Sequence, residues 1–220
     1  MLDPNELLDF LFEQGINFFA GVPDSQLKEF CNCLMQLLGI GKQHVIAPNE
    51  GNAVALAAGY HLATGKTGMV YMQNSGLGNA VNPVASLIDP KVYAIPVIFM
   101  IGWRGMPGTH DEPQHVKQGE VTLHLLETLG IEHMLLDKET LMDDVRVIFK
   151  EQFLPALRQG KSTAFVVKKD AFRAGKPYIY ENEYKLAREH AIQLVLDSIG
   201  ESDVVVSTTG KISREIYEQR

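Results

Sequence analysis

Short apolar runs alternate with amphipathic runs over the first 168 residues of the chain. Apolar runs bounded by polar or glycine residues predict buried strands, at residues 16–25, 44–48, 67–74, 92–102, 132–136 and 162–169. Between them, apolar residues at helical spacing predict helices, at residues 2–15, 26–39, 49–65, 77–89, 119–130 and 138–160. This order indicates an α/β fold, with a mostly parallel six-stranded sheet and helices on both of its faces.

Polar residues mark where several of these helices should begin. Asp3 precedes Pro4, which is the pattern of an N-cap followed by proline at the first helical position. Either Asp24 or Ser25 can cap the second helix, and Asn49 is the expected cap of the third.

The pattern changes after residue 168. Residues 169–182 are polar and irregular, which is typical of a linker. The residues beyond it read as helix, strand and helix, at 183–200, 203–210 and 212–220. One strand–helix step cannot enclose a core of its own. We therefore expect a first domain at 1–168 and, after the linker, the truncated start of a second α/β domain at 183–220.

Composition and charge narrow the class of protein. The chain has 220 residues, 45% of them hydrophobic, and a net charge of −7. An acidic surface does not attract nucleic acid or an anionic membrane, so we expect neither as a partner. Cys31 and Cys33 lie two positions apart on a helix and read as reduced thiols. The N-terminus lacks the basic region of a signal peptide, and no apolar run reaches the length of a membrane span, which predicts a cytoplasmic protein.

Two glycine motifs have part of the pattern of a phosphate-binding loop. Gly65-Lys66-Thr67 ends a helix instead of opening one, and Tyr60 stands where the motif needs its first glycine. Gly76 and Gly78 lie between a strand and a helix, but the third glycine of a dinucleotide fingerprint is absent. A nucleotide-binding protein is therefore disfavoured. The second motif still places backbone N–H groups at the carboxyl edge of the sheet, where open α/β folds bind ligands.

Glu50 opens the most apolar of the predicted helices. Gly51 and residues 53–59 are small or apolar on every side, so we expect this helix to be buried, as at a subunit contact. A carboxylate there loses its water, and no lysine or arginine follows before Lys66. We therefore expect its partner to come from outside the segment 45–87. The simpler alternative is an acid that stabilises the helix dipole by about 0.3–1 kcal/mol.

The segment NEGNAVALAAGYHLATGKTGMVYMQNSGLGNAVNPVASL, residues 49–87, resembles the pyrimidine-binding domain of thiamine-diphosphate enzymes. It is most similar to the acetohydroxyacid synthase and 2-oxoacid decarboxylase branch. With GVPDS at residues 21–25 and the loop WRGMPGTHDEPQH at residues 103–115, it looks closest to the phosphonopyruvate decarboxylases and next to the sulfopyruvate decarboxylases. The resemblance extends over residues 1–170.

The resemblance implies a role for Glu50 as a catalytic and cofactor-binding residue. In the family this glutamate hydrogen-bonds a ring nitrogen of the aminopyrimidine and stabilises the tautomer that activates the thiazolium carbon. The reaction implied is the decarboxylation of phosphonopyruvate, a 2-oxoacid, to phosphonoacetaldehyde and CO₂ by a carbon–carbon lyase. The alternatives are a sulfopyruvate decarboxylase and a non-catalytic pyrimidine domain kept as an assembly module.

The resemblance also assigns residues in the loops that follow the strands. Asp24 is implied as a proton-relay group and Ser25 as a substrate contact, although both could simply cap a helix. Asn74, Ser75 and Gly76 would approach the pyrimidine or the substrate; the alternative is an ordinary polar helix start.

The loop at residues 103–115 carries the remaining candidates. His110 is implied to line the active site as a catalytic residue, and His115 is a weaker candidate for substrate contact. Arg104 has the guanidinium fork that suits a phosphonate or sulfonate, but it could equally pair with Asp111 or Glu112.

Thiamine diphosphate in this family is bound with Mg²⁺ through a GDG motif of a second domain, and the sequence has no GDG. We therefore expect the metal ligands outside this chain segment, because nothing in it offers the several oxygen ligands that Mg²⁺ requires. Thr209 and Gly210 resemble a phosphate-side turn of that second domain. The resemblance thus implies a missing diphosphate-binding domain or a separate partner chain, and a homo-oligomer of at least two subunits.

Overall fold

The computed structural model describes residues 1–208 and 210–220. The chain divides into two compact units, Met1–Tyr178 and Ile179–Arg220. Among the described residues, no helix is both long and apolar enough to cross a lipid bilayer.

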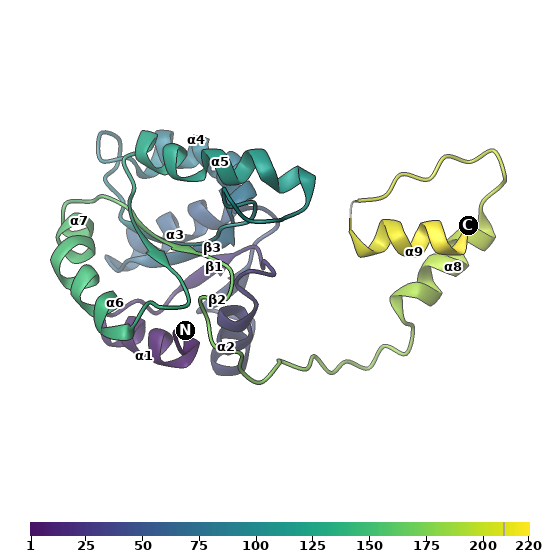
Figure 1. Cartoon of the computed structure of the whole chain (residues 1–220), viewed down its shortest axis with the longest axis horizontal. Coiled ribbons are helices and arrows are strands. Elements are labelled where there is room, and N and C mark those ends of the chain that lie inside the picture. The colour runs from purple at the N-terminus through teal and green to yellow at the C-terminus, as the bar shows by residue number, and fades with distance from the viewer. Residues whose placement is uncertain (209) are drawn as a thin grey trace. The chain divides into compact units, whose positions relative to one another are not determined.

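The first unit is built on one sheet (Figure 1). Within the described residues the sheet has six strands, all parallel, in the order β2-β1-β3-β4-β6-β5. The strands are β1 (Phe19–Gly21), β2 (His44–Ile46), β3 (Gly68–Gln73), β4 (Val97–Gly102), β5 (Glu132–Leu136) and β6 (Thr163–Val167). The predicted α/β class and the six-stranded parallel sheet are therefore confirmed.

Helices cover both faces of the sheet (Figure 1). The helices of the first unit are α1 (Pro4–Glu13), α2 (Lys28–Leu38), α3 (Glu50–Thr64), α4 (Leu77–Pro83), α5 (Pro113–Thr128), α6 (Met142–Ile148) and α7 (Leu154–Arg158). A 3₁₀ turn, η1 (Asn74–Gly76), leads into α4, and two π-helical segments, η2 (Val84–Ile88) and η3 (Phe149–Phe153), follow α4 and α6. Helices α1, α2, α6 and α7 contribute to one hydrophobic cluster, and α3, α4 and α5 contribute to the other.

Successive residues of each central strand point into opposite clusters, as a pleated strand requires. Met69 and Tyr71 of β3 belong to the cluster that contains α1 and α2. Val70 and Met72 belong to the cluster that contains α3 and α4. Because both faces of the sheet are covered, the strands read as continuous apolar runs, and this is why sequence pattern alone located them.

Several helices differ from the expectation. The helix expected at 77–89 is α4 followed by η2, and the helix expected at 183–200 begins at Arg188. Helix α2 begins at Lys28 with Leu27 as its N-cap, so neither Asp24 nor Ser25 caps it. Helix α5 begins at Pro113 and takes in residues expected in a loop. The helix expected at 138–160 is interrupted by η3, just before Pro155, whose nitrogen cannot donate the hydrogen bond that a regular α-helix needs. The caps expected at Asp3 and Asn49 are confirmed.

The second unit contains α8 (Arg188–Ser198) and α9 (Lys211–Gln219). An ion pair between Arg188 and Glu215 joins these two helices. The strand expected at 203–210 is wrong, because the described residues 203–208 form no strand. Val204 and Val206 are 87% and 90% exposed, since this unit provides no neighbouring strand to pair with them.

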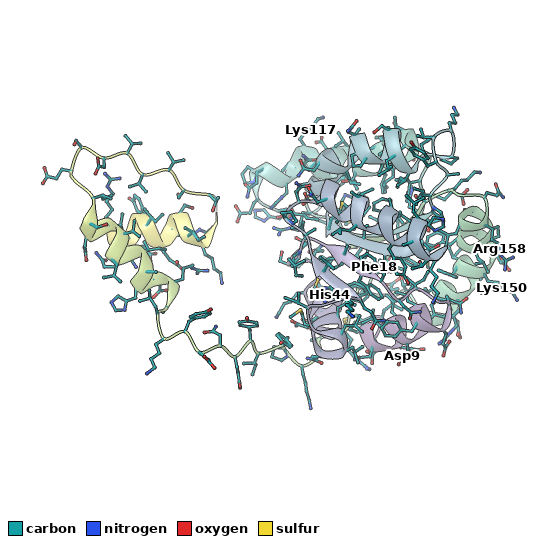
Figure 2. All side chains as sticks on the ribbon, turned by 180° about the vertical axis from the view of Figure 1, so that it is seen from behind. Asp9, Phe18, His44, Lys117, Lys150 and Arg158 are labelled. Atoms are coloured by element: carbon teal, nitrogen blue, oxygen red, sulfur yellow. The ribbon has the colours of Figure 1, made fainter. Side chains whose placement is uncertain are left out.

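A buried polar pair lies beneath the sheet edge where β2 joins β1. The side chain of His44, labelled in Figure 2, is 1% exposed. Its Nδ1 lies 2.7 Å from the carbonyl oxygen of Gly39, which can only accept, so Nδ1 carries the proton. Its Nε2 therefore accepts from the hydroxyl of Tyr71 at 2.9 Å. Burial lowers the pKa of His44 and raises the pKa of Tyr71, so both side chains are neutral in the folded protein.

We predict that His44 makes the chain less stable in mild acid. Its pKa is lowered on folding, so between the unfolded value of about 6.5 and the folded value the unfolded state binds a proton that the folded state does not. The stabilisation is complete above the unfolded pKa and is lost as pH falls through that window. Urea unfolding of the wild type at several pH values between 7 and 5 should show this loss.

The matched variants are His44→Gln and His124→Gln, because the His124 side chain is 84% exposed. We expect the first substitution to flatten the pH dependence by up to about 1.4 kcal/mol per pH unit, and the second to leave it as in the wild type. An identical pH slope in all three proteins would show that His44 is not buried in the neutral form.

Candidate functional site

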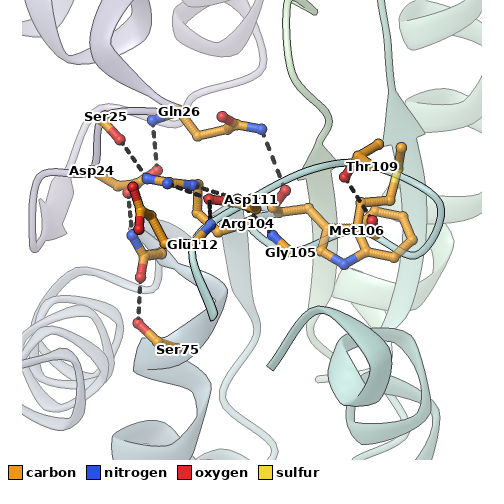
Figure 3. Close-up of polar contacts among 12 residues, drawn as sticks. Asp24, Ser25, Gln26, Ser75, Arg104, Gly105, Met106, Thr109, Asp111 and Glu112 are labelled. Atoms are coloured by element: carbon orange, nitrogen blue, oxygen red, sulfur yellow. Dashed lines mark hydrogen bonds and ion pairs between the residues drawn. The ribbon is translucent and has the colours of Figure 1, made fainter. Parts of the chain in front are cut away.

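Loops that follow four neighbouring strands carry most of the predicted site residues. Figure 3 labels Asp24 and Ser25, Ser75, and Arg104 from three of these loops. Asp24 and Ser25 follow β1, Glu50 follows β2, Asn74 follows β3, and Arg104 follows β4. Because all the strands are parallel, these residues lie at the same edge of the sheet, beyond the carboxyl ends of the strands. The chain order also reverses at this edge, where β1 lies between β2 and β3. This is the position where open α/β folds bind ligands.

Glu50 is the first residue of α3 and is half-buried. Its Oε2 accepts a hydrogen bond from Nδ2 of Asn79 at 2.7 Å. Across residues 1–208 and 210–220 it makes no ion pair, and its Oε1 has no hydrogen-bond partner from the protein. The expectation of a partner from outside residues 45–87 is therefore wrong for this carboxylate oxygen, because a neutral amide of the same segment holds it.

Gly76 lies against the side chain of Glu50. A Cβ on Gly76 would stand 2.5 Å from both Cδ and Oε1 of Glu50, which is closer than real Cβ contacts. A Cβ on Gly78, two positions later, would have no heavy atom within 4 Å. Gly76 therefore leaves the space that the Glu50 side chain occupies. The spacing of the glycines in the sequence did not predict this contact.

Within this chain helix α3 is buried on one face only, and burial of its other face at a subunit contact stays a prediction. Its buried face consists of Ala53, Val54, Ala57 and Ala58. On the opposite face Leu56 is 38% exposed and Leu62 is 69% exposed. The helix has no polar face, so the apolar composition that predicted burial leaves an apolar surface exposed on this chain.

Asp24 is 8% exposed and is held by two donors. Its Oδ2 accepts from the backbone N–H of Gln26 at 2.8 Å, and its Oδ1 accepts from Nε2 of Gln73 at 2.7 Å. The side-chain oxygen of Gln73 accepts from the hydroxyl of Ser75 at 2.7 Å. Gln73 thus links the loops after β1 and β3. Sequence reasoning missed Gln73, although a polar residue that ends a buried strand is a signal that could have found it.

Asn74 joins the ends of β3 and β4. It is 1% exposed, and its Nδ2 donates to the carbonyl oxygen of Arg104 at 2.8 Å and to the hydroxyl of Thr122 at 2.9 Å. Its Oδ1 accepts from the backbone N–H of Arg104 at 3.1 Å. All of these contacts are with the protein. Asn74 therefore holds the loop after β4 in place, and its amide is not directed at a ligand as expected.

Arg104 pairs with Asp111, one of the two partners that the sequence left open (Figure 3). Its Nε and Nη2 donate to the two carboxylate oxygens at 2.8 and 2.6 Å. The backbone N–H groups of Gly105 and Glu112 also donate to this carboxylate, both at 2.8 Å. The hydrogen bonds from Arg104 are the largest cause that lowers the pKa of Asp111, and they also raise the pKa of the guanidinium. The pair closes the loop 104–111 on itself.

A pocket of about 270 Å³ opens beside this ion pair. We call it the loop pocket, and it is lined by Ser25, Gln26, Trp103, Arg104, Met106, Thr109, His110, Asp111 and Lys169. The structure therefore brings Ser25, Arg104 and His110 together, as expected. His115 is not among the lining residues and lies on α5 instead of in a loop. Lys169 was missed, because the sequence placed it in a linker.

Thr209 and Gly210, the remaining candidates, belong to the second unit. Thr209 lies outside the described residues. Gly210 has a φ of 103°, in the region that favours glycine, and precedes the first residue of α9. Among the residues that the structure does describe, no three His, Cys, Asp or Glu side chains gather as a metal site.

Comparison with known proteins gives a family match over most of the first unit. The model described as the thiamine pyrophosphate enzyme, N-terminal TPP binding domain, matches residues 5–133. The chain is similar in fold to the crystal structure of benzoylformate decarboxylase from Polynucleobacter necessarius, with a TM-score of 0.54 and 16% identity over 90% of this chain and 36% of that one.

Two relatives are more similar in sequence. Phosphonopyruvate decarboxylase of Streptomyces viridochromogenes is 34% identical over 233 residues, which cover 99% of this chain and 57% of that protein. Sulfopyruvate decarboxylase subunit alpha of Methanococcus maripaludis is 36% identical over 121 residues, which cover 55% of this chain and 69% of that subunit. The chain thus spans little more than half the length of the first relative.

We predict that Gly76→Ala destabilises the first unit. The added methyl group must displace the flexible Glu50 side chain, so the expected cost is that of its lost hydrogen bond with Asn79, about 0.5–1.5 kcal/mol. Gly78→Ala is the matched control, because its methyl group meets open space and alanine is favoured over glycine in a helix by about 1 kcal/mol. The free energies of unfolding in urea compare the two variants. Equal stabilities would contradict the close contact between Gly76 and Glu50.

We also predict that the Arg104–Asp111 pair makes stability depend on acid. The pKa of Asp111 is lowered on folding, so its contribution is complete above the ordinary carboxyl pKa near 3.8 and is lost as pH falls through the lower folded value. Asp111→Asn should lower stability at pH 7 and make its decline between pH 5 and pH 2 shallower. Asp143→Asn, at a side chain that is 91% exposed, should do neither. Parallel pH curves for wild type and Asp111→Asn would refute the assignment.

Proposed function

This chain belongs to the thiamine pyrophosphate enzyme family, and we propose that it supplies the pyrimidine-binding half of a decarboxylase that acts on phosphonopyruvate. The products are phosphonoacetaldehyde and CO₂. The observation that carries the proposal is the position of Glu50 at the start of α3. One carboxylate oxygen is held by Asn79, and the other has no protein partner among the described residues.

The residues present fit the pyrimidine ring of thiamine diphosphate. A ring nitrogen needs a carboxylate that is fixed in position and has an oxygen to spare, and Glu50 meets both conditions. When it is bound, the cofactor supplies the electron sink that makes loss of CO₂ from a 2-oxoacid possible. The part of Glu50 is to hold a proton at the ring nitrogen through a charge-assisted hydrogen bond, which is worth about 1.5–3 kcal/mol.

Asp24 and His110 are proposed as the proton-handling groups on the substrate side. Asp24 is buried and oriented by Gln26 and Gln73, so its position is fixed before substrate binds. His110 lines the loop pocket and is exposed, so it can exchange protons with solvent. Ser75 and Asn74 act as positioning residues, because their hydrogen bonds hold Gln73 and the loop after β4.

The diphosphate group and its Mg²⁺ require residues from elsewhere. We propose that they are held by a diphosphate-binding domain, which begins in residues 183–220 and continues in the same protein or in a partner chain. Two facts support this division. The chain spans 57% of its phosphonopyruvate decarboxylase relative, and a sulfopyruvate decarboxylase relative is itself one subunit, named alpha. The exposed apolar face of α3 supports a homo-oligomer, since such a face is stable when another subunit covers it.

Sulfopyruvate decarboxylation is the second candidate, because the sulfopyruvate decarboxylase subunit alpha is 36% identical over its match. Phosphonopyruvate is preferred, because the phosphonopyruvate decarboxylase relative matches 99% of this chain, against 55% for the subunit. The ratio of kcat/KM for the two substrates decides between them. A non-catalytic assembly module is the third candidate, and it gives no reason for the fit of Glu50 against Gly76.

The experiment that tests the proposal is Glu50→Gln in the complete enzyme with thiamine diphosphate and Mg²⁺. The substitution keeps the size of the side chain and its hydrogen bond with Asn79 but removes the negative charge, so the fold should persist. We expect kcat for decarboxylation to fall about 100-fold or more, which is the scale of a lost acid–base contribution.

Glu120→Gln is the matched control, because this glutamate pairs with Lys117 on the exposed surface of α5. It should leave turnover unchanged. Wild-type turnover in a folded Glu50→Gln enzyme would refute the role of this residue, and the absence of decarboxylation in the wild type would refute the proposed function.

A further inference from the structure

Two cationic side chains line the loop pocket, and only one of them is paired with a carboxylate. Arg104 is neutralised by Asp111 through two hydrogen bonds, so this pair brings little net charge to the pocket. Lys169 also lines the pocket, and it has no carboxylate within 4.0 Å anywhere in the part of the chain that the structure describes. Asp24 and Glu112 also contribute to the raised pKa of Arg104, so acidic side chains surround this guanidinium. Lys169, which is exposed, is the cation of this pocket that makes no ion pair within the described residues.

The neighbouring residue, Lys168, has surroundings that differ from those of Lys169. Lys168 follows β6 directly, and its ammonium group lies 3.3 Å from Oδ2 of Asp137. Lys168 does not line the loop pocket, whereas Lys169 does. Two adjacent lysines thus have the same charge but different surroundings, one with an acidic partner and one at the pocket.

Ser25 adds a hydrogen-bond donor to the same pocket. Its hydroxyl oxygen accepts from Nη1 of Arg104 at 3.0 Å, so the hydroxyl proton points elsewhere. Within the described ranges 1–208 and 210–220, this proton has no acceptor. The hydroxyl of Thr109 differs, because it already donates to the carbonyl oxygen of Met106 at 2.6 Å. The pocket therefore offers an anion the ammonium group of Lys169 and the hydroxyl of Ser25, beside the ring of His110, which makes no hydrogen bond within the described residues.

We propose that Lys169 and Ser25 bind the tetrahedral oxyanion of the substrate, and that Lys169 sets the preference for a 2-oxoacid with a phosphonate group. This rests on the proposed function, because it names the part of that substrate which the loop pocket binds. Arg104 is a positioning residue here: it shapes the loop through Asp111 and orients the hydroxyl of Ser25. The assignment differs from the sequence-based expectation, which gave the oxyanion to Arg104 itself.

Kinetics of the complete enzyme test the proposal with Lys169→Met, and with Lys168→Met as a control of equal charge change. The substrates are phosphonopyruvate and pyruvate, which lacks the phosphonate. For Lys169→Met we expect kcat/KM on phosphonopyruvate to fall about 10- to 100-fold, mainly through KM, as for a lost charge-assisted hydrogen bond. Pyruvate turnover by this variant, and both activities of Lys168→Met, should change less than about twofold, because no phosphonate contact is lost. An equal loss on both substrates, or no loss on phosphonopyruvate, would overturn the role of Lys169.

A binding measurement separates this proposal from the proposed function. Methylphosphonate, followed by its ³¹P signal, should bind to the wild-type protein and to Lys168→Met, and at least about 10-fold more weakly to Lys169→Met and Ser25→Ala. If the wild type decarboxylates no 2-oxoacid but binds methylphosphonate in this pattern, the function fails and the anion site stands. If all four proteins bind methylphosphonate equally, or none does, the anion site fails whatever the activity.

Discussion

The side chain of Glu50 fits against Gly76, and the arrangement of the site depends on this contact. The glutamate opens the helix after β2, whereas the glycine belongs to the turn after β3. The two segments can meet because the sheet order puts both of these loops beside the loop after β1. Without a Cβ at residue 76, the carboxylate can reach Asn79 and leave one oxygen for a ligand. This contact therefore links two unusual features of the sequence: the glycine motif that begins at Gly76 and the acidic residue that opens an apolar helix.

A second set of contacts fixes the other side of the site. Asn74 joins the turn after β3 to the loop after β4, and Asp111 closes that loop around Arg104. Asn74 is buried, Arg104 and Asp111 are partly buried, and each of the three has hydrogen-bond partners from the protein. The part of the loop pocket that Arg104 and Asp111 form is therefore held before any ligand binds. Such pre-organisation reduces the entropy that binding must cost.

The sequence predicted the fold well, because the features that define it are local. Strands β4 and β6 are buried at every residue, as their continuous apolar runs predict. The strand expected at 132–136 has those bounds, although only its last residue is buried. The start of α2 was wrong because the Asp24 carboxylate bonds the N–H of Gln26 in a turn that precedes the helix. The start of α5 was wrong because residues 113–118 lack an apolar period, although Pro113 is a signal for the first turn of a helix. The strand at 203–210 failed because a strand needs a neighbour, and pattern does not show whether one is present.

The sequence predicted which residues lie near the site, but it did not predict the contacts among them. Residues that follow strands were expected at one edge of the sheet, and the parallel strands place them there. The hydrogen bonds that hold these residues come from partners that are distant in sequence. Gln73 donates to Asp24, and Asn79 donates to Glu50. The role proposed for Lys169 depends on the same kind of information, because its neighbour Lys168 pairs with Asp137 and does not line the loop pocket.

The most direct test of the account is a crystal structure of the complete enzyme with thiamine diphosphate bound. The account predicts that a carboxylate oxygen of Glu50 lies at hydrogen-bond distance, about 2.6–3.2 Å, from a nitrogen of the pyrimidine ring. It would be contradicted by a bound cofactor whose pyrimidine ring contacts other residues while Glu50 faces solvent or pairs with a lysine or arginine.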